Sequence, residues 1–103
     1  IAFNGSYYTP RCKGCSGITA TGVDVRSSIY HQGMRVVAVD KNVIPLYSIL
    51  GISTPTESFR AIALDTGGAI KGHKIDILVE SKELAYKLGR HTIYIKVIRH
   101  DKN

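Results

Sequence analysis

Asp-Thr-Gly-Gly-Ala-Ile-Lys-Gly at Asp65–Gly72, followed by Asp76 within Lys-Ile-Asp-Ile, is the most informative stretch of this 103-residue chain. It joins two carboxylates through a loop that carries little side-chain bulk. Glycine allows the backbone to come close to a ligand, and a carboxyl group at each end of such a loop can act as a general acid or base. The stretch is therefore predicted to line a reaction site.

The residues on both sides of this glycine loop predict β-strands. Arg60–Leu64 is an apolar run that leads directly into Asp65. After the loop, Lys74–Glu80 alternates, and one of its faces is uniformly apolar, formed by Ile75, Ile77 and Val79. Asp76 falls on the opposite face. We therefore expect Asp76 to leave the core and to face a surface or groove.

Other short segments complete a mainly β pattern. Runs of β-branched and aromatic residues predict three further strands, at Phe3–Thr9, Arg35–Val39 and Thr92–Ile98. Ser81–Leu88 predicts a short helix with Ser81 as N-cap and Gly89 as its stop. Turn-forming residues predict loops at Ser27–Gly33 and around Pro55. Many short strands with one helix are typical of a barrel-like domain.

Length and charge limit the class of protein. A chain of 103 residues suits one domain, residues 1–103, and it contains no apolar run of membrane-spanning length. No export signal is visible, and we expect no membrane contact from this domain. The formal charge of +6 favours polyanionic surroundings, such as nucleic acid or an anionic cell wall. The basic residues are dispersed and form no nucleic-acid-binding motif, so we expect no nucleic-acid partner.

The two cysteines, Cys12 and Cys15, form a CxxC pair. Glycine and serine surround the pair, whereas a thioredoxin-like motif opens a helix after a strand, so redox catalysis is disfavoured. The four histidines are isolated and lack the spacing of a zinc finger. Two interpretations stay open. A short disulfide would brace an N-terminal loop and favour an oxidising compartment, and the alternative is a pair of free thiols.

Two local motifs offer alternative readings of the glycine loop. A phosphate-binding loop is disfavoured because His73 and Lys74 stand where Lys and then Ser or Thr should follow. The Asp-Thr-Gly turn at Asp65 follows an apolar strand. The same arrangement occurs in aspartic proteases, where the aspartates of two such turns share a proton. The turn lies late in this chain and the motif is short. An aspartic-protease-like peptidase is therefore kept only as an alternative function.

Four ordered blocks carry a more specific resemblance. They are Gly17–Gly22, Val37–Asp40, Val43–Leu46 and Asp65–Asp76, with Tyr-Thr-Pro at Tyr8–Pro10 ahead of them. This order resembles the three-aspartate, or 3D, domain family, and within it the stationary-phase survival (YuiC-like) cell-wall proteins. The resemblance leaves open whether the chain is of bacterial or phage origin. The chain departs from the family at Lys41, Tyr47 and the loop around Pro55.

The resemblance implies both a fold and an activity. The fold is a six-stranded double-psi β-barrel with one or two short helices, similar to the catalytic core of membrane-bound lytic transglycosylase A. The activity is cleavage of the glycan strands of peptidoglycan, in a cell-wall or secreted, extracytoplasmic setting. The family's three aspartates fall on Asp40, Asp65 and Asp76, and Asp76 matches the catalytic acid. No metal or organic cofactor is implied.

Further residues would complete the site around Asp76. Asp65 and Asp40 would orient Asp76 and the bound sugar, although Asp40 could equally cap a turn. Lys71 would bind acetyl or lactyl oxygens or face solvent. The other groove candidates are Gly68, Thr21 and Tyr8. A non-catalytic peptidoglycan-binding module is the main alternative function, and a barrel this small is compatible with a strand-swapped homodimer.

Overall fold

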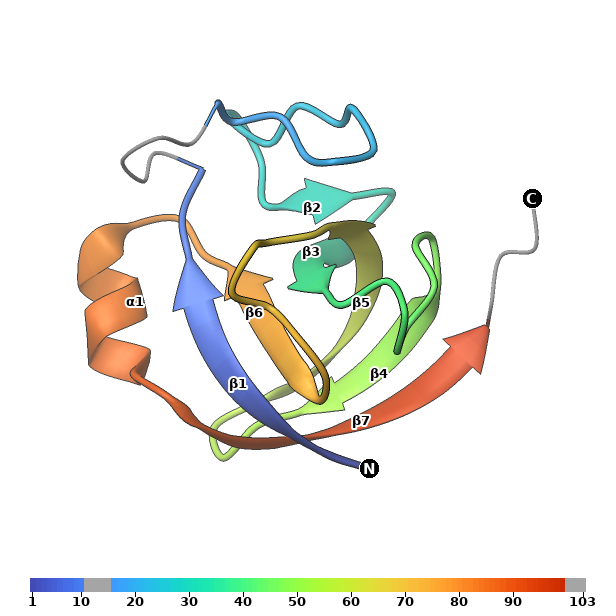
Figure 1. The fold of residues 1–103 in the computed structure, drawn as a ribbon. Coiled ribbons are helices and arrows are strands. Elements are labelled where there is room, and N and C mark those ends of the chain that lie inside the picture. The colour runs from blue at the N-terminus through green and yellow to red at the C-terminus, as the bar shows by residue number, and fades with distance from the viewer. Residues whose placement is uncertain (11–15, 100–103) are drawn as a thin grey trace.

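The computed structural model describes residues 1–10 and 16–99 (Figure 1). They form seven strands and one helix: β1 (Ala2–Tyr8), β2 (Tyr30–His31), β3 (Met34–Val39), β4 (Ile49–Ser53), β5 (Ser58–Asp65), β6 (Lys74–Leu78), α1 (Lys82–Leu88) and β7 (His91–Arg99). Cys12 and Cys15 lie outside the described residues. Their disulfide therefore stays a prediction.

Six of the strands close into a barrel. The order is β3-β5-β4-β7-β1-β6, and β6 returns to pair with β3, while the short β2 pairs with β3 beside the ring. The β1–β6 and β3–β5 pairs are parallel, whereas β3–β6, β4–β5, β4–β7 and β1–β7 are antiparallel. Closure leaves no free edge in the ring. The expected fold class, a mainly β chain with a six-stranded double-psi barrel and a short helix, is confirmed.

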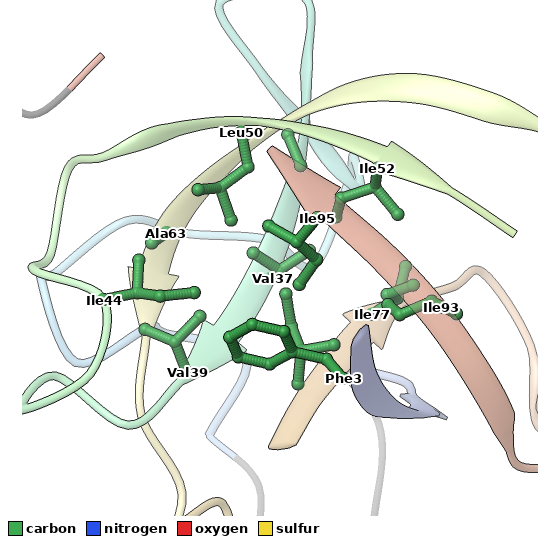
Figure 2. Close-up of a cluster of buried hydrophobic side chains, with 12 residues drawn as sticks. Phe3, Val37, Val39, Ile44, Leu50, Ile52, Ala63, Ile77, Ile93 and Ile95 are labelled. Atoms are coloured by element: carbon green, nitrogen blue, oxygen red, sulfur yellow. The ribbon is translucent and has the colours of Figure 1, made fainter. Parts of the chain in front are cut away.

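Alternating side chains fill the barrel. Figure 2 shows inward-facing residues of several strands meeting in one cluster, among them Phe3, Val37, Ile77 and Ile93. Ile75 and Ile77 are fully buried in this cluster, as the alternation of Lys74–Glu80 predicted. Because side chains alternate along a strand, burial of Ile75 and Ile77 directs Asp76 to the outer face of the barrel.

A second apolar cluster lies outside the barrel. It joins outward-facing strand residues to the segment between β1 and β2, through Val25, Ile29, Val36, Ile62, Leu64 and Leu78, with Tyr8 packed against them. Figure 1 shows that the segment from residue 16 to β2 lies on the side of the barrel where β2 and β3 are. This cluster therefore holds a long connection against the strands that carry the candidate aspartates.

Most of the predicted elements are confirmed. The five predicted strands match observed strands within two residues at each end. In the helix, the Ser81 hydroxyl accepts a hydrogen bond from the Leu84 amide, and Gly89 closes the last turn with φ of 67°. Strand β4 was not predicted. The predicted loop Ser27–Gly33 was wrong in part, because Tyr30 and His31 form β2 and enter a hairpin whose turn residues Gln32 and Gly33 both have positive φ.

The described part of the chain contains no helix with the length and apolar character needed to cross a membrane.

Candidate active site

The three aspartates converge near the end of β3. Ala38 on β3 pairs with Asp76 on β6 and also with Asp65 on β5. Asp40 follows β3 two residues after Ala38. Residues that are distant in sequence therefore meet because β3 lies between β5 and β6 in the closed barrel.

An irregularity in the β3–β5 pairing turns Asp65 outward. Val37 pairs with Ala63, but the next residue, Ala38, pairs with Asp65, so one residue of β5 is left over. That residue, Leu64, already packs in the outer cluster. Without the bulge, strict alternation would direct Asp65 into the barrel. The bulge places Asp65 on the same face as Asp76.

Asp76 is half-buried on that outer face. The Ser6 hydroxyl on β1 donates a 2.8 Å hydrogen bond to Asp76 Oδ1, and the two residues are paired in the parallel β1–β6 ladder. Burial raises the pKa of Asp76 above its ordinary value, and the charge of Asp65 acts in the same direction. The Ser6 hydrogen bond and the nearby Arg90 and Lys74 charges oppose this rise. Asp76 is thus favoured to hold a proton more strongly than a solvated aspartate.

Asp65 is fixed by three donors. Its Oδ2 accepts a 3.1 Å hydrogen bond from the Tyr8 hydroxyl, and its Oδ1 accepts from the amides of Ala20 at 2.8 Å and Thr66 at 2.9 Å. Burial, followed by the charge of Asp65, raises the pKa of Tyr8, so its hydroxyl remains a donor. The two oxygens of Asp65 are therefore held by one hydroxyl group and two backbone amides.

Two adjoining cavities give access to these carboxylates. A cavity of about 410 Å³ is bordered by Asp76, Ser6 and side chains of α1, and one of about 200 Å³ is bordered by Asp65 and the segment Ser16–Ile18. Tyr8 and Thr9 line both cavities. The larger one falls in the usual volume range of ligand pockets. A half-buried carboxyl beside such a cavity can give a proton to a bound substrate.

Asp40 has a different environment. Its Oδ2 accepts a 2.9 Å hydrogen bond from the Gly72 amide, and its Oδ1 accepts a 3.0 Å bond from the Asn42 amide. The Gly72 bond, followed by the Asn42 bond, lowers the pKa of Asp40. Asp40 thus remains ionised and ties the end of the glycine loop to the end of β3.

The weaker candidates divide between these regions. Lys71 and Gly68 border a cavity of about 350 Å³ together with Asp40. The Thr21 hydroxyl donates a 2.8 Å hydrogen bond to the carbonyl of Leu64, the extra residue of the β5 bulge. Thr21 therefore holds the long connection against β5, whereas Tyr8 lies between Asp65 and Asp76.

Sequence reasoning missed several residues around Asp76. Ser6 was within reach, because it lies two positions before Tyr8 on the same face of a predicted strand. Lys82, Tyr86 and Arg90 also line the Asp76 cavity. No local pattern signals these three, since the docking of α1 beside β1 brings them to the cavity.

The described residues offer no obvious metal centre. Within 1–10 and 16–99, no three histidine, cysteine or acidic side chains gather as a metal site requires.

A family comparison covers the part of the chain that carries all three aspartates. The model of the 3D domain matches residues 35–99, which include Asp40, Asp65 and Asp76. The chain belongs to the 3D domain family. The resemblance inferred from the ordered sequence blocks is therefore confirmed.

Three proteins of Bacillus subtilis (strain 168) are similar to this chain. It is 47% identical over 89 residues to the SPbeta prophage-derived uncharacterized protein YorM, covering 85% of this chain and 37% of YorM. The chain is also 47% identical over 92 residues to the putative cell wall shaping protein YabE, in a match that covers 88% of this chain and 21% of YabE. It is 46% identical over 91 residues to the cell wall-binding protein YocH, in a match that covers 88% of this chain and 30% of YocH. The chain thus spans well under half the length of each.

The barrel is also similar to that of a lytic transglycosylase, MltA from E. coli. The crystal structure of MltA gives a TM-score of 0.53 with 26% identity, over 78% of this chain and 27% of MltA. The structure of MltA with bound chitohexaose gives a TM-score of 0.54 with 24% identity over the same shares, 78% and 27%. The likeness establishes a shared fold across a minor part of MltA.

Proposed function

We propose that this 3D domain cleaves the glycan strands of peptidoglycan as a lytic transglycosylase. Its target would be the β-1,4 bond between N-acetylmuramic acid and N-acetylglucosamine, and its product a 1,6-anhydromuramoyl end. The observation that carries the proposal is the half-buried Asp76, with its raised pKa, beside a cavity of about 410 Å³. The fold shared with MltA and the relatives named for the cell wall support the substrate class.

Asp76 would act first as an acid. In its protonated form it gives its proton to the glycosidic oxygen, the bond from the muramoyl anomeric carbon to that oxygen breaks, and N-acetylglucosamine leaves with a free hydroxyl. This step needs a carboxyl group that keeps its proton near the working pH. Burial of Asp76 acts in that direction.

Asp76 would then act as a base. Its carboxylate removes the proton of the muramoyl 6-hydroxyl, and that oxygen bonds to the anomeric carbon of the same sugar. Because the attack is intramolecular, the nucleophile is present at high effective concentration and water is not consumed. The proton returns to Asp76, so the residue ends the cycle in its starting state. No second carboxylate has to form a covalent intermediate.

The other residues would position these groups. Asp65, held by Tyr8 and two amides, places a fixed negative charge near Asp76 and helps to keep it protonated. Asp40 orients the glycine loop through the Gly72 amide. In this scheme Lys71 and Gly68, which border the cavity beside Asp40, extend the groove for the glycan, and Thr21 holds the long connection against β5.

Digestion of purified sacculi tests the reaction. Mass spectrometry of the released fragments should detect anhydromuropeptides with the unmodified domain, and Asp76→Asn should abolish their release while leaving the circular dichroism spectrum unchanged. Asp24→Asn is a matched control, because Asp24 is an exposed aspartate paired with Arg26 at 2.7 Å. Release of anhydro products by a folded Asp76→Asn protein at the rate of the unmodified domain would refute the role of Asp76.

Peptidoglycan binding without cleavage is the second candidate function. Its support is the relative YocH, which is named a cell wall-binding protein. The same digest separates the two functions: sacculi that bind the domain but stay intact indicate a binding module, and new reducing ends indicate a hydrolase. Either function would place the domain in the cell wall or outside the cell.

A further inference from the structure

One face of α1 forms a wall of the Asp76 cavity. The helix residues at this wall are Lys82, Ala85 and Tyr86, and Gly89 follows one turn later. Positions separated by three, four and seven residues lie on one side of a helix. Ala85 and Gly89 leave space, whereas Lys82 and Tyr86 have long side chains, and Tyr86 is 86% exposed. Figure 1 shows α1 lying alongside β1 and near β6, the strands that carry Ser6 and Asp76.

The end of α1 directs a second cation to this cavity. Gly89 adopts φ of 67°, a left-handed conformation that a side chain would strain. Arg90, the next residue, also lines the cavity. The guanidinium is close enough to lower the pKa of Asp76. Arg90 is therefore near the proposed point of bond cleavage.

Neither cation forms an ion pair with a carboxylate of the described residues. Across residues 1–10 and 16–99, the ion pair present is that of Arg26 with Asp24. Asp76 accepts its hydrogen bond from the Ser6 hydroxyl, and the Arg90 charge acts on it without an ion pair. Two cations that line one cavity and form no ion pair make a site that is complementary to an external anion.

We propose that Arg90, assisted by Lys82, binds a carboxylate of the glycan and so selects acidic muramoyl glycans over neutral ones. This inference rests on the proposed function. N-acetylmuramic acid bears a lactyl group, which ends in a free carboxylate or in a peptide stem that has carboxylates of its own. A chitin-type glycan has the same linkages and acetamido groups but no carboxylate. A guanidinium can hold a carboxylate through two parallel hydrogen bonds, which Lys cannot reproduce.

Calorimetric titration tests this selection. The proteins would carry Asp76→Asn, so that no ligand is cleaved, and the ligands would be a peptide-free muramoyl glycan, a peptide-bearing one and chitohexaose. Arg90→Gln should lower the affinity for an acidic glycan about tenfold, as expected for a lost charge-assisted bond, and should leave chitohexaose binding unchanged. Lys82→Gln should lower the affinity for an acidic glycan by a smaller factor than Arg90→Gln. Lys87→Gln, on the same exposed helix, is the matched control and should have no effect.

The pattern of losses identifies the carboxylate. A loss confined to the peptide-free glycan assigns it to the lactyl group, and a loss confined to the peptide-bearing glycan assigns it to the stem. Arg90→Lys, which keeps the charge, should recover part of the affinity and guards against a folding defect.

Two other results would overturn the assignment. Suppose that the protein with Arg90 binds acidic glycans. If Arg90→Gln binds them equally well, or loses affinity for all three ligands alike, Arg90 does not select acidic glycans, while the proposed glycan cleavage is unaffected. If no glycan binds and sacculi remain intact, the proposed function fails and the selection fails with it.

Discussion

Asp76 and Asp40 lie close to the end of the same strand, β3, yet their surroundings are opposite. Asp76 is half-buried beside a cavity, accepts one hydroxyl hydrogen bond and has a raised pKa. Asp40 accepts two backbone amides and has a lowered pKa. Backbone donors favour the charged form of a carboxyl group, and burial favours the neutral form.

The difference separates two tasks within one motif. An acid that must release a proton during a reaction needs to hold it beforehand. An acid that fixes a loop needs to stay charged and to accept stable hydrogen bonds. In the proposed reaction, proton transfer therefore belongs to the Asp76 cavity and support of the glycine loop to Asp40.

The largest expected effect is on glycan cleavage. Asp76→Asn should lower the rate of anhydromuropeptide release at least about 100-fold, the usual contribution of a general acid or base. Asp40→Asn should lower it less than about tenfold, because the residue acts through the glycine loop rather than on the reacting atoms. The measurement is the initial rate of product release from sacculi. Equal losses in the two variants would remove the distinction between the regions.

A smaller effect is expected from Tyr8→Phe, which removes the hydroxyl donor to Asp65. Loss of one hydrogen bond costs about 1 kcal/mol, which is about fivefold in rate if the bond acts in the transition state. Tyr7→Phe is the control, since its hydroxyl lies 2.9 Å from His91 Nε2.

Both tyrosine variants should unfold more readily, but only Tyr8→Phe should also slow cleavage. Urea unfolding combined with cleavage rates measures the two effects. A rate loss in Tyr7→Phe of the same size would indicate a general loss of order rather than a role for Asp65.

Thermal stability should report the lowered pKa of Asp40. A depressed pKa in the folded state stabilises the fold above the ordinary value of 3.8, and this stabilisation is lost as the pH falls through the folded pKa. The Asp40→Asn variant should therefore have a lower melting temperature than the unsubstituted protein at pH 7, and this difference should disappear in acid. A gap that persists well below pH 3.8 would mean that the charge of Asp40 is not responsible.

The smallest effect should have the opposite sign. Because the pKa of Asp76 is raised, its contribution to stability is complete below 3.8 and is lost as the pH rises through the folded pKa. Asp76→Asn should therefore melt slightly above the unsubstituted protein at pH 7, with the gain disappearing in acid. Calorimetric melting at several pH values checks this. A lower melting temperature at pH 7 would contradict the raised pKa.

Local patterns predicted the elements whose signals are contained within a few residues. The alternation around Ile75 and Ile77 placed Asp76 on the outer face, and Ser81 with Gly89 marked the limits of α1. Strand β4 was missed because Ile49–Ser53 is a short apolar run interrupted by Gly51, without clear alternation. Its pairing with β5 and β7 makes it a strand.

By itself, then, the sequence determined the barrel class, the family and the outward direction of Asp76, because a two-residue period and the ordered blocks are properties of consecutive residues. Only the tertiary structure decided how Asp65 faces, since that depends on one extra residue in the pairing of β5 with β3. It also decided that Ser6 and Arg90 surround Asp76. These residues come from separate elements, and only closure of the barrel and docking of α1 bring them to one cavity.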